Sequence, residues 1–231
     1  MPLFTSIYSD LLELLLPRYC SACSIVLQTS ERHICIYCLY DLPLTRFEFY
    51  KNNPLYRLFW GRVMLQQATA LLYFKRCGKA RKIIHQLKYK GQSDLAYQMG
   101  FMLGLTIKQS HIFEVPDFIV PVPGSASKIR SRGYNQCTYI ANGVADAANS
   151  HVREDLLKTG KSKSTQTRKG RYARYLNVKD GFISKAEENQ EFSILIVDDV
   201  VTTGATLESC ARTLQERGFS RISIAALAWT S

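Results

Sequence analysis

Apolar and polar positions alternate along the chain in blocks that predict strands and helices in turn. Apolar runs typical of strands occupy residues 68–74, 118–122, 194–197 and 221–228. Helical periodicity is found over residues 78–90, 94–109 and 207–217 and in a stretch that ends near residue 148. Because helices separate the apolar runs, the pattern predicts an α/β fold, with an open parallel sheet flanked by helices.

Residues 1–16 are rich in leucine, but Asp10 and Glu13 interrupt the apolar run and no basic flank precedes it. The run is therefore too short and too acidic for a membrane span or a secretory signal. We expect an amphipathic helix packed on its own domain, with a helix lying on a membrane surface as the alternative. Without an export signal, the expected compartment is the cytoplasm.

Two CxxC pairs follow, separated by eleven residues. They consist of Cys20, Cys23, Cys35 and Cys38. Two such pairs can complete the tetrahedral sulfur shell of structural Zn²⁺, and a closed shell leaves no position for a catalytic water. The sequence thus predicts a small N-terminal zinc ribbon. The alternative is four unconnected reduced thiols. His33 lies inside the cluster but is not expected to replace a cysteine, because the four cysteines already form two matched pairs.

An aromatic-rich stretch over residues 40–60 separates this cluster from the first predicted strand. We therefore expect a helix and zinc-ribbon module over residues 1–60 and an α/β domain over residues 61–231. Cys77, Cys137 and Cys210 stand singly in the α/β segments, where a buried, small apolar side chain is the usual role of cysteine.

The third of the four apolar runs is followed by the most informative motif. Residues 194–197 end in Asp198 and Asp199, and the loop that follows opens a helix. This loop consists of Thr202, Thr203, Gly204, Ala205 and Thr206. Backbone N–H groups and hydroxyls can bind a phosphate there, with Gly204 allowing close approach. The alternative is a solvated turn with helix-capping Asp and Thr.

The two carboxylates do not suit that phosphate, because like charges repel. They suit a neighbouring diol or a bound Mg²⁺ instead. A ligand with a phosphate at one end and hydroxyls nearby is a sugar 5-phosphate. The motif stands at the carboxyl end of a predicted parallel strand, where open α/β sheets bind ligands.

Two further loops are polar and basic. Residues 121–136 leave a strand through a Pro/Gly/Ser loop that includes Gly124 and Ser125 and carries Lys128, Arg130 and Arg132. Residues 158–174 show almost no apolar periodicity and are predicted to form a long mobile loop.

The chain carries 30 Lys and Arg residues against 19 Asp and Glu residues, a formal charge of +11. This excess favours polyanionic partners such as nucleic acid, phosphorylated metabolites or an acidic membrane surface. The basic residues that could contact such a partner include Lys88, Lys90, Arg130 and Arg132. Solvated surface is the alternative interpretation of the basic runs.

Several blocks of the sequence resemble known families. VDDVVTTGAT resembles the phosphoribosyl pyrophosphate (PRPP) signature of type I phosphoribosyltransferases. PVPGSASKIRSRGYNQ, HQLKYKG, TQTRKGRYARYLNV and the CxxC pairs resemble the remaining blocks of the ComF/GntX family. A departure is the Gly124–Ser125–Ala126 run, because family members usually carry Leu-His-Pro there.

The resemblance implies roles for the residues of these blocks. Asp198 and Asp199 would contact the ribose hydroxyls, directly or through Mg²⁺, while residues 202–206 hold the 5-phosphate. The turn at Gly124 and Ser125 would receive the pyrophosphate. A flexible loop over residues 165–177 would close over the site, with the basic side chains Arg168, Lys169 and Arg171.

The resemblance also implies a function in natural competence and DNA utilisation, with PRPP and single-stranded DNA as ligands. A DNA-uptake helicase or other competence proteins are candidate partners. The alternative is an active phosphoribosyltransferase that transfers the phosphoribosyl group to a nucleobase-like acceptor. The sequence contains no motif that identifies an acceptor pocket.

Overall fold

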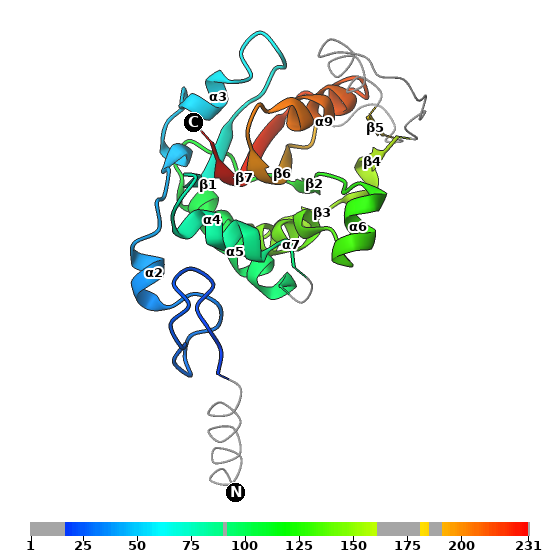
Figure 1. Ribbon diagram of the computed structural model, residues 1–231. Coiled ribbons are helices and arrows are strands. Elements are labelled where there is room, and N and C mark those ends of the chain that lie inside the picture. The colour runs from blue at the N-terminus through cyan, green and yellow to red at the C-terminus, as the bar shows by residue number, and fades with distance from the viewer. Residues whose placement is uncertain (1–16, 90–91, 161–180, 185–190, 231) are drawn as a thin grey trace, which may run out of the picture.

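The computed structural model describes residues 17–89, 92–160, 181–184 and 191–230 (Figure 1). Its main sheet has five strands in the order β1-β7-β6-β2-β3, and all neighbouring pairs are parallel. The strands are β1 (Ala68–Tyr73), β2 (Phe118–Pro121), β3 (His151–Val152), β6 (Ile194–Val201) and β7 (Ile222–Trp229). The prediction of an open parallel sheet is confirmed.

Helices cover both faces of this sheet (Figure 1). One face packs against α4 (Lys79–Gln86), α5 (Ser93–Gln109) and α7 (Gln136–Ala148), and the other against α3 (Pro54–Arg57) and α9 (Ala205–Gln215). Successive residues of β6 serve the two faces in turn. Leu195 and Val197 join the α4–α5–α7 core, whereas Ile194 and Ile196 join the α9 core. Burial on both faces explains the continuous apolar character of the strand.

Helices α5 and α7 pack unusually closely, because glycines stand at their crossing. A Cβ atom on Gly143 would overlap the backbone carbonyl of Tyr97, and one on Gly100 would overlap the carbonyl of Ile140. The two backbones are therefore in direct contact, with no side chain between them.

The ribbon begins with an isolated bridge between Tyr19 and Val26 and ends in the short helix α2 (Ile36–Tyr40). Its buried residues join the same apolar cluster as Ile83 of α4 and Leu95 of α5. The segment that follows contains η1 (Phe47–Phe49) and α3, and Phe59 beyond them packs in the α9 core. The boundary near residue 60 stays a prediction.

Three details differ from the sequence-based expectations. Residues 126–132 form helix α6 (Ala126–Arg132), which ends at Gly133 with a φ of 86°. Strand β6 continues to Val201, because it keeps pairing with β7 as far as Trp229. Cys77 is exposed, whereas Cys137 and Cys210 are buried as predicted.

Of the predicted mobile loop over residues 158–174, only residues 158–160 are among the described ones. Its first residues follow η2 (Glu154–Leu156) and form β4 (Lys158–Thr159), which pairs antiparallel with β5 (Phe182–Ile183). Residues 161–180 and the predicted helix over residues 1–16 lie outside the described residues. No helix within the described ranges is long and apolar enough to cross a membrane.

Candidate functional site

The carboxyl ends of β2 and β6 lie side by side at a point where the chain changes direction. From β2 the chain runs through α6 and α7 to β3 on one side, and from β6 it runs through α9 to β7 on the other. Pro121 is paired with Val197, so the residues that follow each of them share one edge of the sheet. Such a switch point is where open α/β sheets bind ligands.

The loop after β6 turns tightly into α9. Gly204 has a φ of 73° and stands at the N-cap of the helix, with Ala205 as its first residue. Thr202, Thr203 and Thr206 are exposed, so their hydroxyls are accessible to a ligand. A left-handed φ followed by a helix start turns successive N–H groups toward one point, which suits an anion.

The underside of this loop rests on the segment before β1. A Cβ on Gly204 would lie 2.9 Å from ring carbons of Phe59. The Arg62 guanidinium donates to the carbonyl oxygen of Thr203 at 2.9 Å and pairs with the buried carboxylate of Glu208. Arg212 pairs with the same carboxylate at 3.0 Å. These contacts hold the loop from below and leave its outer side open.

Asp198 and Asp199 lie in the second half of β6, shortly before this loop, and both are half-buried. The backbone N–H of Asp199 donates to Oδ1 of Asp198 at 2.8 Å, and the N–H of Val200 donates to Oδ1 of Asp199 at 2.8 Å. Burial, and then the charge of Asp199, raises the pKa of Asp198 to about 7. Two adjacent carboxylates at this depth favour a cation between them and the ligand.

The start of α7 supplies two more partners to these carboxylates. The Gln136 amide donates to Oδ2 of Asp199 at 2.9 Å, and the Cys137 thiol donates to Oδ1 of Asp198 at 3.4 Å. Arg132 in turn donates to Oε1 of Gln136 at 2.7 Å. The α6–α7 turn therefore orients both carboxylates.

The same turn contacts two other parts of the chain. The Asn135 amide donates to the carbonyl oxygen of Val122 at 3.1 Å, just beyond β2. The Tyr134 hydroxyl lies 2.8 Å from the carbonyl oxygen of Leu87 and 2.9 Å from that of Tyr89, after α4. Three blocks that are distant in the sequence thus meet at one edge of the sheet.

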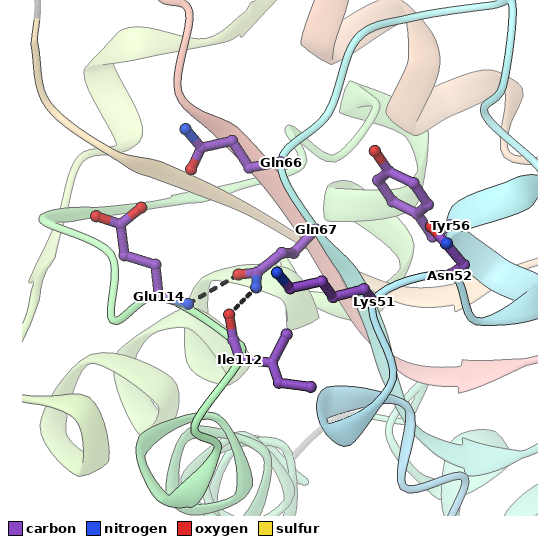
Figure 2. A pocket seen from close by; sticks show the side chains of 7 residues that line it. All are labelled: Lys51, Asn52, Tyr56, Gln66, Gln67, Ile112 and Glu114. Atoms are coloured by element: carbon purple, nitrogen blue, oxygen red, sulfur yellow. Dashed lines mark hydrogen bonds between the residues drawn. The ribbon is translucent and has the colours of Figure 1, made fainter.

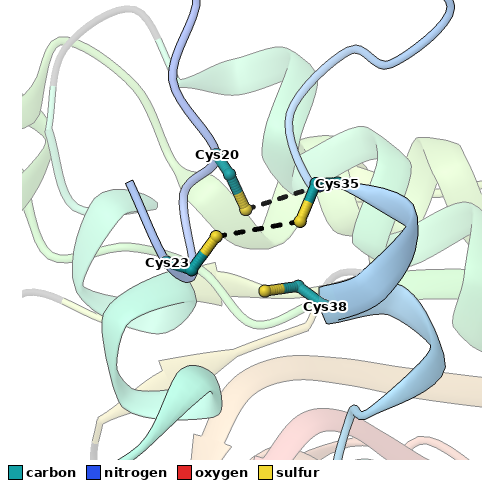
Figure 3. A group of neighbouring side chains, drawn as sticks. All are labelled: Cys20, Cys23, Cys35 and Cys38. Carbon is teal, nitrogen blue, oxygen red and sulfur yellow. Dashed lines mark hydrogen bonds between the residues drawn. The ribbon is translucent and has the colours of Figure 1, made fainter. Parts of the chain in front are cut away.

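The four ribbon cysteines form a separate centre, in which their sulfur atoms all lie within 4.8 Å of one another (Figure 3). Sulfurs of Cys23 and Cys35 are 3.7 Å apart, close to the separation of about 3.8 Å that tetrahedral Zn–S bonds of about 2.3 Å require. Cys20, Cys35 and Cys38 are buried. This donor set fits structural Zn²⁺, and the group of metal-ligating side chains does not include His33.

Backbone N–H groups prepare one of these sulfurs for a cation. Sγ of Cys20 accepts hydrogen bonds from the N–H groups of Ala22 and Cys35, each at 3.4 Å. Burial raises the pKa of the Cys20 thiol, but these hydrogen bonds outweigh it and lower the pKa to about 6. Burial and the neighbouring Cys23 thiol raise the pKa of Cys38 to about 12. The four sulfurs therefore cannot all ionise together without a cation to offset their charge.

Residues 108–229 match the family described as "Phosphoribosyl transferase domain", which is more than half of the chain. The chain belongs to the phosphoribosyl transferase domain family. The matched range contains the β2 exit, the α6–α7 turn and the phosphate loop. The resemblance to ComF proteins is also confirmed, because the curated relatives carry competence and DNA-utilisation names.

Three of these bacterial relatives show how much of the chain is matched. The chain is 28% identical to Competence protein F of Haemophilus influenzae over 152 residues, 63% of this chain and 66% of that protein. It is 27% identical to DNA utilization protein YhgH of Escherichia coli K12 over 145 residues, 62% of this chain and 63% of that protein. It is 25% identical to Competence protein ComFC of Bacillus subtilis, over 87% of this chain and 79% of that protein. The first two matches thus span less than two thirds of the relatives' length.

Among solved structures, the chain is similar to the allosteric regulatory enzyme of purine biosynthesis, with a TM-score of 0.42 and 18% identity. That match covers 62% of this chain and 30% of the other. A second is the purine phosphoribosyltransferase of Pyrococcus horikoshii, with a TM-score of 0.34 and 20% identity over 60% of this chain and 73% of the other.

The remaining predicted residues of this phosphoribosyl transferase family member are spread around the site. Gly124 is half-buried beside Asn135, and Ser125 is the exposed N-cap residue of α6. Lys88 and Arg130 are exposed. Arg132 is half-buried and donates to Gln136, so its side chain already has a partner in the site. The candidates outside the described residues are Lys90, Arg168, Lys169 and Arg171.

Sequence reasoning missed Arg62, Gln136 and Cys137 as members of the site. Arg62 and Glu208 are 146 positions apart, and no local pattern connects them. Gln136 is the last residue of the quoted block over residues 121–136 and Cys137 follows it, so their place at the start of a helix was the available signal.

A pocket of about 350 Å³ lies away from this site, near the residues that lead into β1 (Figure 2). Its lining includes Gln66 and Gln67 before β1 and Ile112 and Glu114 before β2. The Gln67 side chain donates to the carbonyl of Ile112 and accepts from the N–H of Glu114. The pocket is therefore at the amino ends of the strands, opposite the edge where the phosphate loop stands.

Proposed function

We propose that this ComF-like protein binds PRPP together with Mg²⁺ and handles single-stranded DNA in the cytoplasm, in natural competence and DNA utilisation. The observation that carries the proposal is the pairing, at one switch point, of an open phosphate loop with two carboxylates. A sugar 5-phosphate has the groups that match them, a phosphate for the loop and hydroxyls for the carboxylates. The family match also supports a phosphoribosyl ligand.

In this proposal each part of the site meets one part of PRPP. Residues 202–206 hold the 5-phosphate through N–H groups and hydroxyls, and the left-handed Gly204 lets the backbone approach closely. Asp198 and Asp199 hold the ribose hydroxyls, directly or through the cation. Mg²⁺, when bound, offsets the negative charge of the pyrophosphate. The exit of β2 at Gly124 and Ser125 faces the same edge and is proposed to receive the pyrophosphate.

The nucleic-acid part of the proposal is supported by the relatives' names and by the charge of +11. Lys88 and Arg130 are both exposed. Lys88 lies just after α4, between the two residues whose carbonyls contact Tyr134, and Arg130 lies on α6, shortly before Tyr134. Contacts of this kind make affinity fall steeply with salt, because each one releases counterions from the strand. A DNA-uptake helicase or another competence protein is the proposed protein partner.

A second candidate function is phosphoribosyl transfer to a nucleobase-like acceptor, which membership of the phosphoribosyl transferase domain family favours. Pyrophosphate release from PRPP in the presence of a panel of bases tests it. Release that depends on one base would establish transfer, whereas PRPP binding without release would leave PRPP as a ligand only.

Calorimetric titration with PRPP, with and without Mg²⁺, tests the site itself. Replacing Asp198 and Asp199 together by Asn is expected to lower the affinity at least about tenfold and to abolish its dependence on Mg²⁺. Asp155→Asn is the matched control, because Asp155 is an exposed carboxylate that pairs with Arg153 outside the site. Unchanged PRPP affinity in the double variant would show that the site is assigned wrongly.

A further inference from the structure

The zinc ribbon leaves many of its apolar side chains in solvent. Six large ones are more than half exposed, and Tyr37 and Tyr40, at 76% and 94%, are the most exposed of them. The six are Tyr19, Ile25, Val26, Ile36, Tyr37 and Tyr40. Tyr37 and Tyr40 are three positions apart on α2, so they are neighbours on the helix surface. A cluster of exposed aromatic side chains on a small module indicates a binding surface.

The segment that carries α4 is strongly basic and contains no acidic residue between positions 75 and 90. Its Lys and Arg residues are Lys75, Arg76, Lys79, Arg81, Lys82, Lys88 and Lys90. Helix α4 buries Ala80, Ile83 and Ile84 in the core, which leaves Arg81 and Lys82 on its exposed side. Within the part of the chain that the structure describes, neither of these two cations pairs with a carboxylate.

An ion pair joins the two features. Lys79 at the start of α4 donates to Oδ2 of Asp41 at 2.6 Å, and Asp41 directly follows Tyr40 at the end of α2. The ribbon and α4 also share one apolar cluster, which contains Cys38 and Ile83. The exposed tyrosines are therefore held next to the basic helix.

The other end of α4 leads toward the carboxyl edge of the sheet. Tyr89 is 53% exposed, and its ring packs against that of His85 with centroids 5.0 Å apart. Its carbonyl oxygen accepts a hydrogen bond from Tyr134, in the turn that orients Asp198 and Asp199. Aromatic and cationic side chains thus occur on α2, along α4 and at Tyr89, which contacts the turn at the candidate phosphate site.

We propose that α2 of the ribbon and the exposed side of α4 form one path for single-stranded DNA. Tyr37 and Tyr40 stack on bases at its ribbon end, while Arg81 and Lys82 contact the phosphates. The proposal rests on the DNA-handling part of the proposed function and places the strand on the ribbon. Aromatic platforms beside a row of cations are how proteins hold single strands without sequence preference.

Charge favours a nucleic acid over a protein as the occupant. Two acidic groups near this surface are already engaged, because Asp41 pairs with Lys79 and both carboxylate oxygens of Glu31 accept backbone N–H groups. The exposed cations Arg81 and Lys82 are left for a polyanion, and their charge repels basic partners.

Fluorescence anisotropy with a labelled oligothymidylate, measured over a series of salt concentrations on the zinc-loaded full chain, tests this path. Replacing Tyr37 and Tyr40 together by Ala is expected to weaken binding about tenfold or more, with the salt slope unchanged. Phe at both positions retains the stacking surface and is expected to restore affinity. Replacing Arg81 and Lys82 by Gln is expected to lower the salt slope by about 0.7 for each lost phosphate contact.

The control is Tyr50→Ala, because Tyr50 is 62% exposed and lies between η1 and α3, outside both α2 and α4. Unchanged PRPP binding in each variant verifies its fold. If the wild-type protein does not bind the oligonucleotide at any salt concentration, the proposed DNA function fails. If it binds and the Tyr37/Tyr40 Ala variant binds equally well, the path is wrong and the tyrosines serve another partner. Equal losses in the Ala and Phe variants would also overturn the stacking role.

Discussion

The ionised form of Asp198 lowers the stability of the folded protein. Burial, and then the charge of Asp199, raises its pKa from the ordinary value of 3.8 to about 7. A shift of about 3 units corresponds to about 4 kcal/mol between the two protonation states. Since the folded state binds the proton more tightly than the unfolded chain does, the free energy of unfolding falls as pH rises from about 4 to about 7. Above pH 7 the full cost of about 4 kcal/mol is present.

Asp198→Asn removes this charge and keeps an oxygen that can accept the hydrogen bond from the N–H of Asp199. Without ligand, the variant is expected to be more stable than the wild type at pH 8, by up to about 4 kcal/mol. At pH 5 the gain falls to about 2 kcal/mol, because wild-type Asp198 is then protonated in the folded state and ionised in the unfolded chain. Urea denaturation of both proteins at the two pH values, without Mg²⁺, measures the difference.

Asp117 provides a control of opposite sign. The backbone N–H and the hydroxyl of Ser193 donate to its carboxylate at 2.7 and 2.8 Å, and they lower its pKa. This carboxylate therefore contributes stability above its ordinary pKa, and the contribution is lost as pH falls through the folded-state pKa. Asp117→Asn is expected to destabilise the protein at pH 8. An Asp198→Asn variant that is no more stable than wild type at pH 8, or whose gain is equal at pH 5 and 8, would refute the assigned cost.

Two further predictions concern the ribbon and the helix crossing. Cys38→Ser is expected to release the zinc and to make the ribbon sensitive to proteolysis, because the metal supplies much of the folding free energy of so small a module. Metal analysis checks this, with Cys77→Ser as the control, since Cys77 is exposed and outside the cluster; full zinc content in the Cys38 variant would contradict a four-cysteine site. Gly143→Ala is expected to destabilise the protein by about 1–3 kcal/mol, since the new Cβ would overlap the Tyr97 carbonyl and force α5 and α7 apart. Urea denaturation measures this loss. The control is Asn142→Ala, because Asn142 is half-buried on the same helix and its replacement is expected to change the stability by no more than about 0.5 kcal/mol. Similar midpoints for the two variants would argue against direct backbone contact.

The sheet could be predicted from the sequence because its strands are buried on both faces and appear as continuous apolar runs. The extent of β6 could not. Asp198 and Asp199 are polar and suggest the start of a loop, yet their backbone groups continue the ladder with β7 as far as Val201. Helix α6 was missed for a related reason, since its described side chains are exposed or half-buried and show no apolar periodicity.

The candidate site was predictable only where its chemistry is local. The phosphate loop and the carboxylates are consecutive in the sequence, so their joint role could be proposed from the motif. The supports of the loop are not consecutive, because Arg62 reaches Thr203 across 141 positions. Pairing of this kind depends on the packing of the segment before β1 under α9, which no local pattern specifies.

The position of the ribbon relates the zinc centre to the proposed DNA path. Cys20, Cys35 and Cys38 belong to the same apolar cluster as Ile83 and Leu87. Ile83 lies on the buried side of α4, and Leu87 directly follows the helix. Loss of the metal would therefore remove packing from beneath the helix whose exposed side carries Arg81 and Lys82. It would also release the tyrosines of α2, which the Lys79–Asp41 pair alone would hold only weakly, since solvent screens an exposed ion pair. A four-cysteine centre that fits structural Zn²⁺ thus lies where a bound metal would order the surface that we assign to the nucleic acid.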